Sequence, residues 1–147
     1  MHALKFMVLL LAAFSQNLSA EEQEMTVYRS PTCGCCGKWI DHAKENGFKI
    51  NDVISSDMDA IKTRFGVPEK LASCHTAVIN GYVVEGHVPA GDIQKMLQTK
   101  PKIVGVAAPG MPMGSPGMEM GGQKDTYNVV SFDKDAKVEV FANHAGN

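Results

Sequence analysis

The chain has 147 residues, a formal net charge of −2, 44 % hydrophobic residues and 20 % charged residues. These values are ordinary for a single globular domain. Neither the net charge nor the distribution of Lys and Arg indicates a nucleic acid or an acidic membrane surface as a partner.

The N-terminal segment, residues 1–20, has the pattern of a cleavable secretory signal. Lys5 precedes an apolar run from Phe6 to Phe14, and the small residues Ser19 and Ala20 come directly before an acidic stretch. The run is much shorter than the about 20 residues of a bilayer span. We therefore expect export, cleavage and no stable membrane insertion afterwards, with an uncleaved anchor or a buried N-terminal helix as the alternative.

The mature chain, residues 21–147, is expected to form one domain that begins with alternating strands and helices. "MTVYRS" predicts a strand over 25–29, and "KWIDHAKENGF" predicts a helix from Lys38. "FKINDVIS" predicts a second strand. "DMDAIKTRFG" predicts a second helix between an Asp57 N-cap and a Gly66 C-cap.

The next stretch completes a recognisable order of elements. "HTAVINGYVVEGH" predicts a β-hairpin through Asn80-Gly81, and "VPAGDIQKMLQTK" predicts a third helix. The order β-α-β-α-β-β-α is that of an α/β, thioredoxin-like fold, in which helices cover both faces of a four-stranded sheet. We expect its core to include Trp39, Phe48, Ile61, Val78 and Val83, with His42 at the surface.

Beyond Lys100 the composition changes. Residues 101–125 are rich in Gly, Pro and Met, so we expect no regular element there. "TYNVVSF" and "KVEVFAN" then predict a second hairpin over residues 126–142, to which we assign no role. His144, close to the C-terminus, is expected to be frayed and solvated.

Three of the four cysteines lie in "SPTCGCCGK", between the first strand and the first helix. Cys33 and Cys36 form a Cys-x-x-Cys pair where a thioredoxin has its active site, and the amides of a helix N-terminus stabilise thiolates there. One interpretation is therefore a thiol–disulfide oxidoreductase with Cys33 as nucleophile and Cys36 as resolving thiol. A structural disulfide is the plainer alternative.

Two features count against a simple redox pair. Cys35 is a third thiol inside the pair, where it would scramble the disulfide. Thioredoxin-like enzymes also place a cis-proline before the third strand, whereas this chain has Cys74 there. We expect the four sulfurs to converge, provided that Cys33 and Cys35 lie in irregular backbone before the helix begins.

Such a cluster of thiols suits a soft metal. The spacing does not match the paired knuckles of a zinc site, whereas crowded thiolates can bridge several Cu(I) ions. The neighbouring methionines also favour copper, although a flexible loop with core-filling methionines is the alternative. The weaker candidate ligands are His75, His87, Met111, Met113 and Met118.

The segments "YRSPTCGCCGKW", "SCHTAVINGYVVEGHVPAGDI" and "APGMPMGSPGME" together resemble the small exported copper-resistance proteins of the CopG family. The resemblance spans about Met25 to Met120. It implies a thioredoxin-like fold in the periplasm, a polynuclear Cu(I)–thiolate site and interconversion of Cu(I) and Cu(II) in copper detoxification. By position it makes the four cysteines the copper ligands: Cys33, Cys35, Cys36 and Cys74.

The leading hypothesis is thus a periplasmic protein that binds more than one Cu(I) ion. Whether it is also an enzyme, a copper oxidoreductase using Cys33 and Cys36, is left open by the sequence. The alternatives are a thiol–disulfide oxidoreductase and a copper chaperone without turnover. The expected partners are copper ions and other periplasmic copper-resistance proteins, with no nucleic acid.

Overall fold

The computed structural model describes residues 22–147, so the predicted signal at residues 1–20 lies outside the described residues. The elements are β1 (Gln23–Arg29), α1 (Gly34–Glu45), β2 (Phe48–Ile54), α2 (Met58–Arg64), the 3-10 turn η1 (Glu69–Leu71), β3 (His75–Ile79), β4 (Tyr82–Gly86), α3 (Ala90–Thr99), β5 (Gly105–Ala108), β6 (Tyr127–Phe132) and β7 (Val138–His144). Within this part of the chain, no helix is long and apolar enough to cross a membrane.

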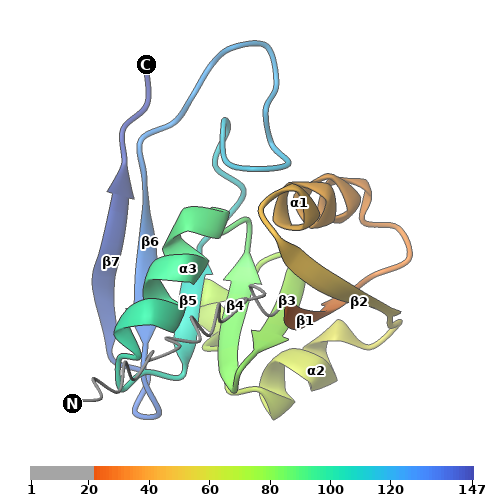
Figure 1. Cartoon of the computed structure of the whole chain (residues 1–147), viewed down its shortest axis with the longest axis vertical. Helices are drawn as coiled ribbons and strands as arrows, with labels where there is room; N and C mark the ends of the chain where they lie inside the picture. The colour runs from red at the N-terminus through yellow and green to blue at the C-terminus, as the bar shows by residue number, and fades with distance from the viewer. Residues whose placement is uncertain (1–21) are drawn as a thin grey trace, which may run out of the picture.

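The first four strands and three helices form the predicted thioredoxin-like unit (Figure 1). β1 pairs in parallel with β2 through the α1 crossover, and β3 lies antiparallel to both β1 and β4. The β3–β4 turn has positive φ at Asn80 (48°) and Gly81 (81°), the backbone that a two-residue hairpin with matching twist requires. The prediction of an α/β, thioredoxin-like fold is confirmed.

The two faces of the sheet are covered by different helices. On one face, Trp39 of α1 and Ile93 of α3 pack against strand residues that include Val27 and Val84. On the other face, the residues that follow α2 pack against the alternate strand residues, such as Val83. Of the five predicted core residues, Trp39, Phe48 and Val83 are buried, whereas Ile61 and Val78 are half-buried.

The sheet has seven strands rather than four, in the order β2-β1-β3-β4-β5-β6-β7. The expectation that residues 101–125 contain no regular element is wrong for Gly105–Ala108, which pair in parallel with β4 and are fully enclosed. Small residues fit this position because a Cβ on Gly105 would collide with the carbonyl oxygen of Val83. The predicted second hairpin is present as β6 and β7, and it extends the main sheet.

Two histidines are less exposed than the sequence predicts. His42 is half-buried, and its Nε2 accepts a hydrogen bond of 3.0 Å from the amide of Ala90 at the start of α3. His144 lies 2.6 Å from Asp92 Oδ2 and stacks on Tyr127, with ring centroids 4.9 Å apart. Both side chains hold elements together, which isolated helix and strand patterns do not reveal.

Candidate metal centre

The cysteine cluster forms where β1 ends and α1 begins. After Arg29 the chain turns, and the amide of Cys33 donates to Ser30 O over 3.2 Å. Cys33 is the N-cap of α1, with extended backbone (φ −85°, ψ 90°), and the helix starts at Gly34 rather than at Lys38. Cys35 therefore lies in the first helical turn, and the expectation that it precedes the helix is wrong.

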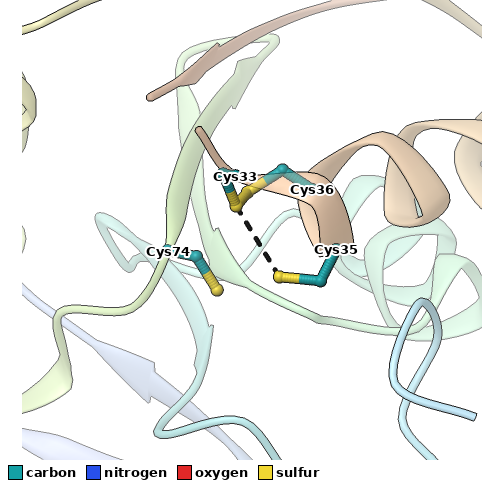
Figure 2. A group of neighbouring side chains, drawn as sticks. All are labelled: Cys33, Cys35, Cys36 and Cys74. Carbon is teal, nitrogen blue, oxygen red and sulfur yellow. Dashed lines mark hydrogen bonds between the residues drawn. A yellow bond between two sulfur atoms is a disulfide. The ribbon is translucent and has the colours of Figure 1, made fainter. Parts of the chain in front are cut away.

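The four sulfur atoms nevertheless converge, each within 4.8 Å of the others (Figure 2). Cys33 and Cys36 form a disulfide, and Cys33 Sγ lies 3.6 Å from Cys35 Sγ. The Cys35 and Cys74 side chains point toward one another, from α1 and from the segment before β3. Because Cys33 lies outside the helix and Cys74 approaches from another element, the helical position of Cys35 does not prevent the convergence.

The two free thiols are in different electrostatic environments. Burial raises the pKa of Cys74, but hydrogen bonds with His87 and Ser73 outweigh it, so this pKa lies below its ordinary value. Burial, and then the charge of Cys74, raise the pKa of Cys35. Cys74 is therefore the first of the two to become a thiolate, the form that attacks disulfides and binds metals.

His87 is fully buried and connects Cys74 to the long segment between β5 and β6. Its Nε2 lies 3.2 Å from Cys74 Sγ, and its Nδ1 lies 2.6 Å from the carbonyl oxygen of Pro116. Since a carbonyl only accepts, Nδ1 carries a proton and Nε2 faces the sulfur. Burial lowers the pKa of His87. The hydrogen bonds with Cys74 and Pro116 raise this pKa by more than burial lowers it, so the net shift is upward.

His75 is the first residue of β3 and is completely enclosed. Its ring lies 4.3 Å from that of Trp39 and 5.2 Å from that of His87, measured between centroids. Within residues 22–147, neither ring nitrogen has a hydrogen-bond partner. Burial, followed by the charges of His87 and Lys62, holds its pKa well below the ordinary value, so the ring is neutral with lone-pair nitrogen available.

Cys74, His75 and His87 form a second group of potential ligand atoms, again within 4.8 Å of one another. All three residues are candidate ligands on the sequence alone, but only the fold brings the two imidazoles next to Cys74. His75 opens β3, whereas His87 comes just after β4, and the hairpin brings these ends together.

The methionine-rich segment, residues 109–126, connects β5 to β6 and lies beside α1 in Figure 1. Met111 is 48 % exposed, and Met113 and Met118 are half-buried. The segment reaches the cysteine cluster through Pro116 and Gly117. A Cβ on Gly117 would lie 3.0 Å from both Cys35 O and His87 Nδ1.

Pro116 and Gly117 are the contributors that sequence reasoning missed. The Pro-Gly pair in "GSPGME" predicts a turn. No local signal indicates that this turn packs on Cys35 and His87, which are distant from it in the sequence, so this contact is a tertiary feature.

Comparison with known proteins identifies the family. A family model described as "Protein of unknown function, DUF411" matches residues 71–118, and no curated protein matches the chain. Two solved structures, described as copper resistance protein copG form 1 and form 2, are 50 % and 49 % identical to it. They cover 86 % and 85 % of this chain, and the chain covers 100 % of each, with TM-scores of 0.81. The chain therefore belongs to the CopG family of copper-resistance proteins.

Proposed function

We propose that this protein acts in the periplasm in copper resistance and binds more than one Cu(I) ion at Cys33, Cys35, Cys36 and Cys74. The observation that carries the proposal is the convergence of the four sulfurs within 4.8 Å of one another. Thiolates prefer soft ions, and sulfurs this close can each bridge two Cu(I) ions. The form with the Cys33–Cys36 bond reduced would be the binding form, because the disulfide removes two ligands.

The imidazoles of His75 and His87 would supply nitrogen ligands beside Cys74. His75 supports this role because its ring nitrogens are enclosed and unpaired within the described residues. Met111, Met113 and Met118 would add thioether ligands from the segment that packs on the cluster through Pro116 and Gly117, since thioethers favour Cu(I) over harder ions.

We further propose that the site interconverts Cu(I) and Cu(II), with Cys33 and Cys36 as the redox-active pair. Two Cu(II) ions would take one electron each from the two thiols. The products are two Cu(I) ions, the Cys33–Cys36 disulfide and two protons released to solvent. The disulfide in this structure would be the oxidised end of that cycle.

Anaerobic titration of the reduced protein with Cu(I), against a competing chelator, tests the binding proposal. We expect more than one Cu(I) per chain in the wild type and a lower stoichiometry in each single Cys→Ser variant. Lys49→Ala, at an exposed strand position, serves as the control and should bind as the wild type does. Failure of the wild type to bind copper above trace level would refute the proposal.

The Cys33–Cys36 disulfide also favours a second candidate, a thiol–disulfide oxidoreductase. This function would use Cys33 and Cys36 and would not need Cys74. Reduction of insulin disulfides by the Cys74→Ser variant separates the two functions. Activity retained at the wild-type level supports the oxidoreductase, whereas loss of copper with little disulfide-reducing activity in either protein supports the copper function.

A further inference from the structure

A buried ion pair lies on the face of the sheet opposite Trp39 and His75. Glu85 of β4 is fully enclosed, and Lys62 of α2 is 9 % exposed. The Lys62 ammonium donates to Glu85 Oε1 and to Thr76 Oγ1, the latter over 3.0 Å. A cation and an anion are thus held together in the interior, between the polar Thr76 on β3 and the apolar residues Val83 and Ala107 of the same face.

The carboxylate also binds the chain on both sides of Cys74. Glu85 Oε1 accepts a hydrogen bond of 2.8 Å from the Ser73 amide, and Oε2 accepts one of 2.6 Å from the Thr76 hydroxyl. Ser73 lies before β3, so its amide has no partner in a neighbouring strand. The Glu85 carboxylate accepts the hydrogen bond of this amide instead. The segment that carries Cys74 is therefore fixed one residue before the sulfur and two residues after it.

The packing of the next residue in β4 reinforces this contact. Gly86 has φ +74°, and a Cβ there would lie 2.8 Å from Ser73 Cβ. The β4 backbone can therefore approach the Cys74 segment this closely only because residue 86 is glycine.

Stability alone does not account for the ion pair. Replacing a buried ion pair by apolar residues of similar size is often neutral or stabilising, because both charges lose their hydration. What an apolar pair cannot provide is an acceptor for the Ser73 amide and the Thr76 hydroxyl. The hydrogen bonds of the carboxylate to the Cys74 segment are thus its distinctive contribution.

We propose that Glu85 is a positioning residue that holds Cys74 from the opposite face of the sheet. The carboxylate keeps Cys74 Sγ within reach of Cys35 and His87. The functional consequence rests on the proposed role of Cys74 as a copper ligand. The geometric consequence is independent of copper and is tested separately.

Two matched double variants isolate the acceptor. Lys62→Met/Glu85→Gln removes both charges but keeps a carbonyl oxygen for the Ser73 amide. Lys62→Met/Glu85→Leu removes the charges and the acceptor together. We call these double variants the Gln pair and the Leu pair. Any difference in behaviour between them reports the hydrogen bond to the Ser73 amide and not the charge.

The first measurement uses copper-free protein with the Cys33–Cys36 disulfide intact. Diamide oxidises Cys35 and Cys74 to a disulfide, at a rate that depends on how well the two sulfurs are held together. We expect the Gln pair to react within about twofold of the wild type and the Leu pair about tenfold more slowly. Equal rates in the two pairs would overturn the proposal.

The second measurement is Cu(I) affinity of the reduced proteins against a chelator. The Leu pair is expected to bind its tightest copper about tenfold more weakly than the Gln pair, with no such difference in a Cys74→Ser background. An equal loss in that background would show a merely structural effect and refute the proposal. A wild type that binds no copper refutes the copper function, while the diamide rates still decide the positioning.

Circular dichroism establishes that both pairs fold before these comparisons. If the Leu pair does not fold, amide hydrogen exchange of the wild type decides instead. The Ser73 amide is expected to exchange slowly, as a donor to a buried carboxylate. Exchange at the rate of an exposed loop would overturn the proposal.

Discussion

Gly117 packs so closely on Cys35, His87 and Trp39 that a side chain at this position would make unusually tight contacts. A Cβ at this position would lie 3.0 Å from Cys35 O, His87 Nδ1 and Trp39 N, and φ is +86°. We therefore predict that Gly117→Ala lowers the free energy of unfolding and displaces the Pro116 carbonyl from His87. Urea denaturation and Cu(I) titration of the variant measure the two effects.

Gly121→Ala is the matched control for this prediction. Gly121 also has positive φ, +67°, but a Cβ there would meet nothing within 4 Å. It should carry the backbone strain alone, about 1–2 kcal/mol, and leave copper binding unchanged. The close-contact explanation fails if Gly117→Ala is no more destabilising than Gly121→Ala and binds copper equally well.

His75 is an enclosed imidazole whose nitrogens are unpaired within residues 22–147. An unpaired buried polar group costs about 1–3 kcal/mol, so we predict that His75→Leu raises the free energy of unfolding of the metal-free protein. If His75 is a copper ligand, the same variant binds copper more weakly. Urea midpoints without metal, together with Cu(I) titration, test both parts.

His87→Leu is expected to lower the free energy of unfolding, the opposite of the effect of His75→Leu. It removes the partner of the Pro116 carbonyl and of the Cys74 thiol, so the metal-free protein should unfold at lower urea. If His75→Leu destabilises the metal-free protein as much as His87→Leu does, the prediction that the unpaired His75 ring lowers stability is wrong.

At the residue scale, the convergence of the four sulfurs was predictable from the sequence, but the groups that hold them in place were not. Cysteine density pointed to Cys33, Cys35 and Cys36, and the place where a thioredoxin has its cis-proline pointed to Cys74. The Pro116 carbonyl and the Glu85 carboxylate were not predictable. One is a backbone atom without a sequence signature, and the other acts from the opposite face of the sheet.

At the element scale, His42 connects α1 to the start of α3. Its Nε2 accepts from the Ala90 amide, so only the uncharged ring can make this bond. Burial is the main cause that lowers the pKa of His42 below its ordinary value of 6.5, and the charges of Glu119 and Glu45 partly oppose it. The folded protein therefore takes up the His42 proton at a lower pH than the unfolded chain does.

The sign of the pH dependence follows from this difference. The contribution of His42 to stability is complete above the unfolded pKa of 6.5 and decreases as the pH falls toward the folded value. We predict that wild-type protein loses more stability than His42→Gln between about pH 7.5 and pH 5.5, by less than about 1.4 kcal/mol per pH unit. Urea unfolding at both pH values measures this.

Glutamine is the informative replacement because its amide oxygen can still accept from Ala90 but does not titrate. The other histidines contribute equally to both proteins, so the difference between them isolates His42. Identical pH profiles for wild type and His42→Gln would show that the helix contact does not depend on the ring's protonation.

Local sequence patterns predicted most of the strands but missed β5. Alternation and turn residues predicted β1 to β4 and both hairpins, because each is specified within a few neighbouring residues. β5 was missed because its four small residues show no alternation, and only pairing with β4 and β6 makes them a strand. The extension of the sheet from four strands to seven therefore depends on contacts that no local pattern specifies.

At the scale of the whole molecule, residues 145–147 connect the β6–β7 hairpin to the segment that packs on the cysteine cluster. Asn147 Nδ2 donates to Gly122 O over 2.9 Å, and Asn147 Oδ1 accepts from the Lys124 amide over 2.8 Å. Asp125, the next residue, exchanges two hydrogen bonds with the backbone of Met113. The order of the methionine-rich segment thus depends on side chains beyond the thioredoxin-like unit.

We predict that Asn147→Ala loosens this segment without unfolding the domain. Two side-chain bonds to residues 122 and 124 are lost, so the backbone near Lys124 should open more often. Limited digestion with trypsin, followed by mass spectrometry, should show faster cleavage after Lys124. Cleavage after Lys134, in the β6–β7 turn away from these bonds, provides an internal reference.

Asn143→Ala is the matched control, because the Asn143 side chain bonds to Asn128 within the hairpin and not to the methionine-rich segment. It should leave cleavage after Lys124 unchanged. If Asn147→Ala and Asn143→Ala are cut at Lys124 equally slowly, Asn147 does not hold the segment. If only Asn147→Ala is cut faster and also binds Cu(I) more weakly, the hairpin takes part in copper binding by ordering the residues that carry Met113 and Pro116.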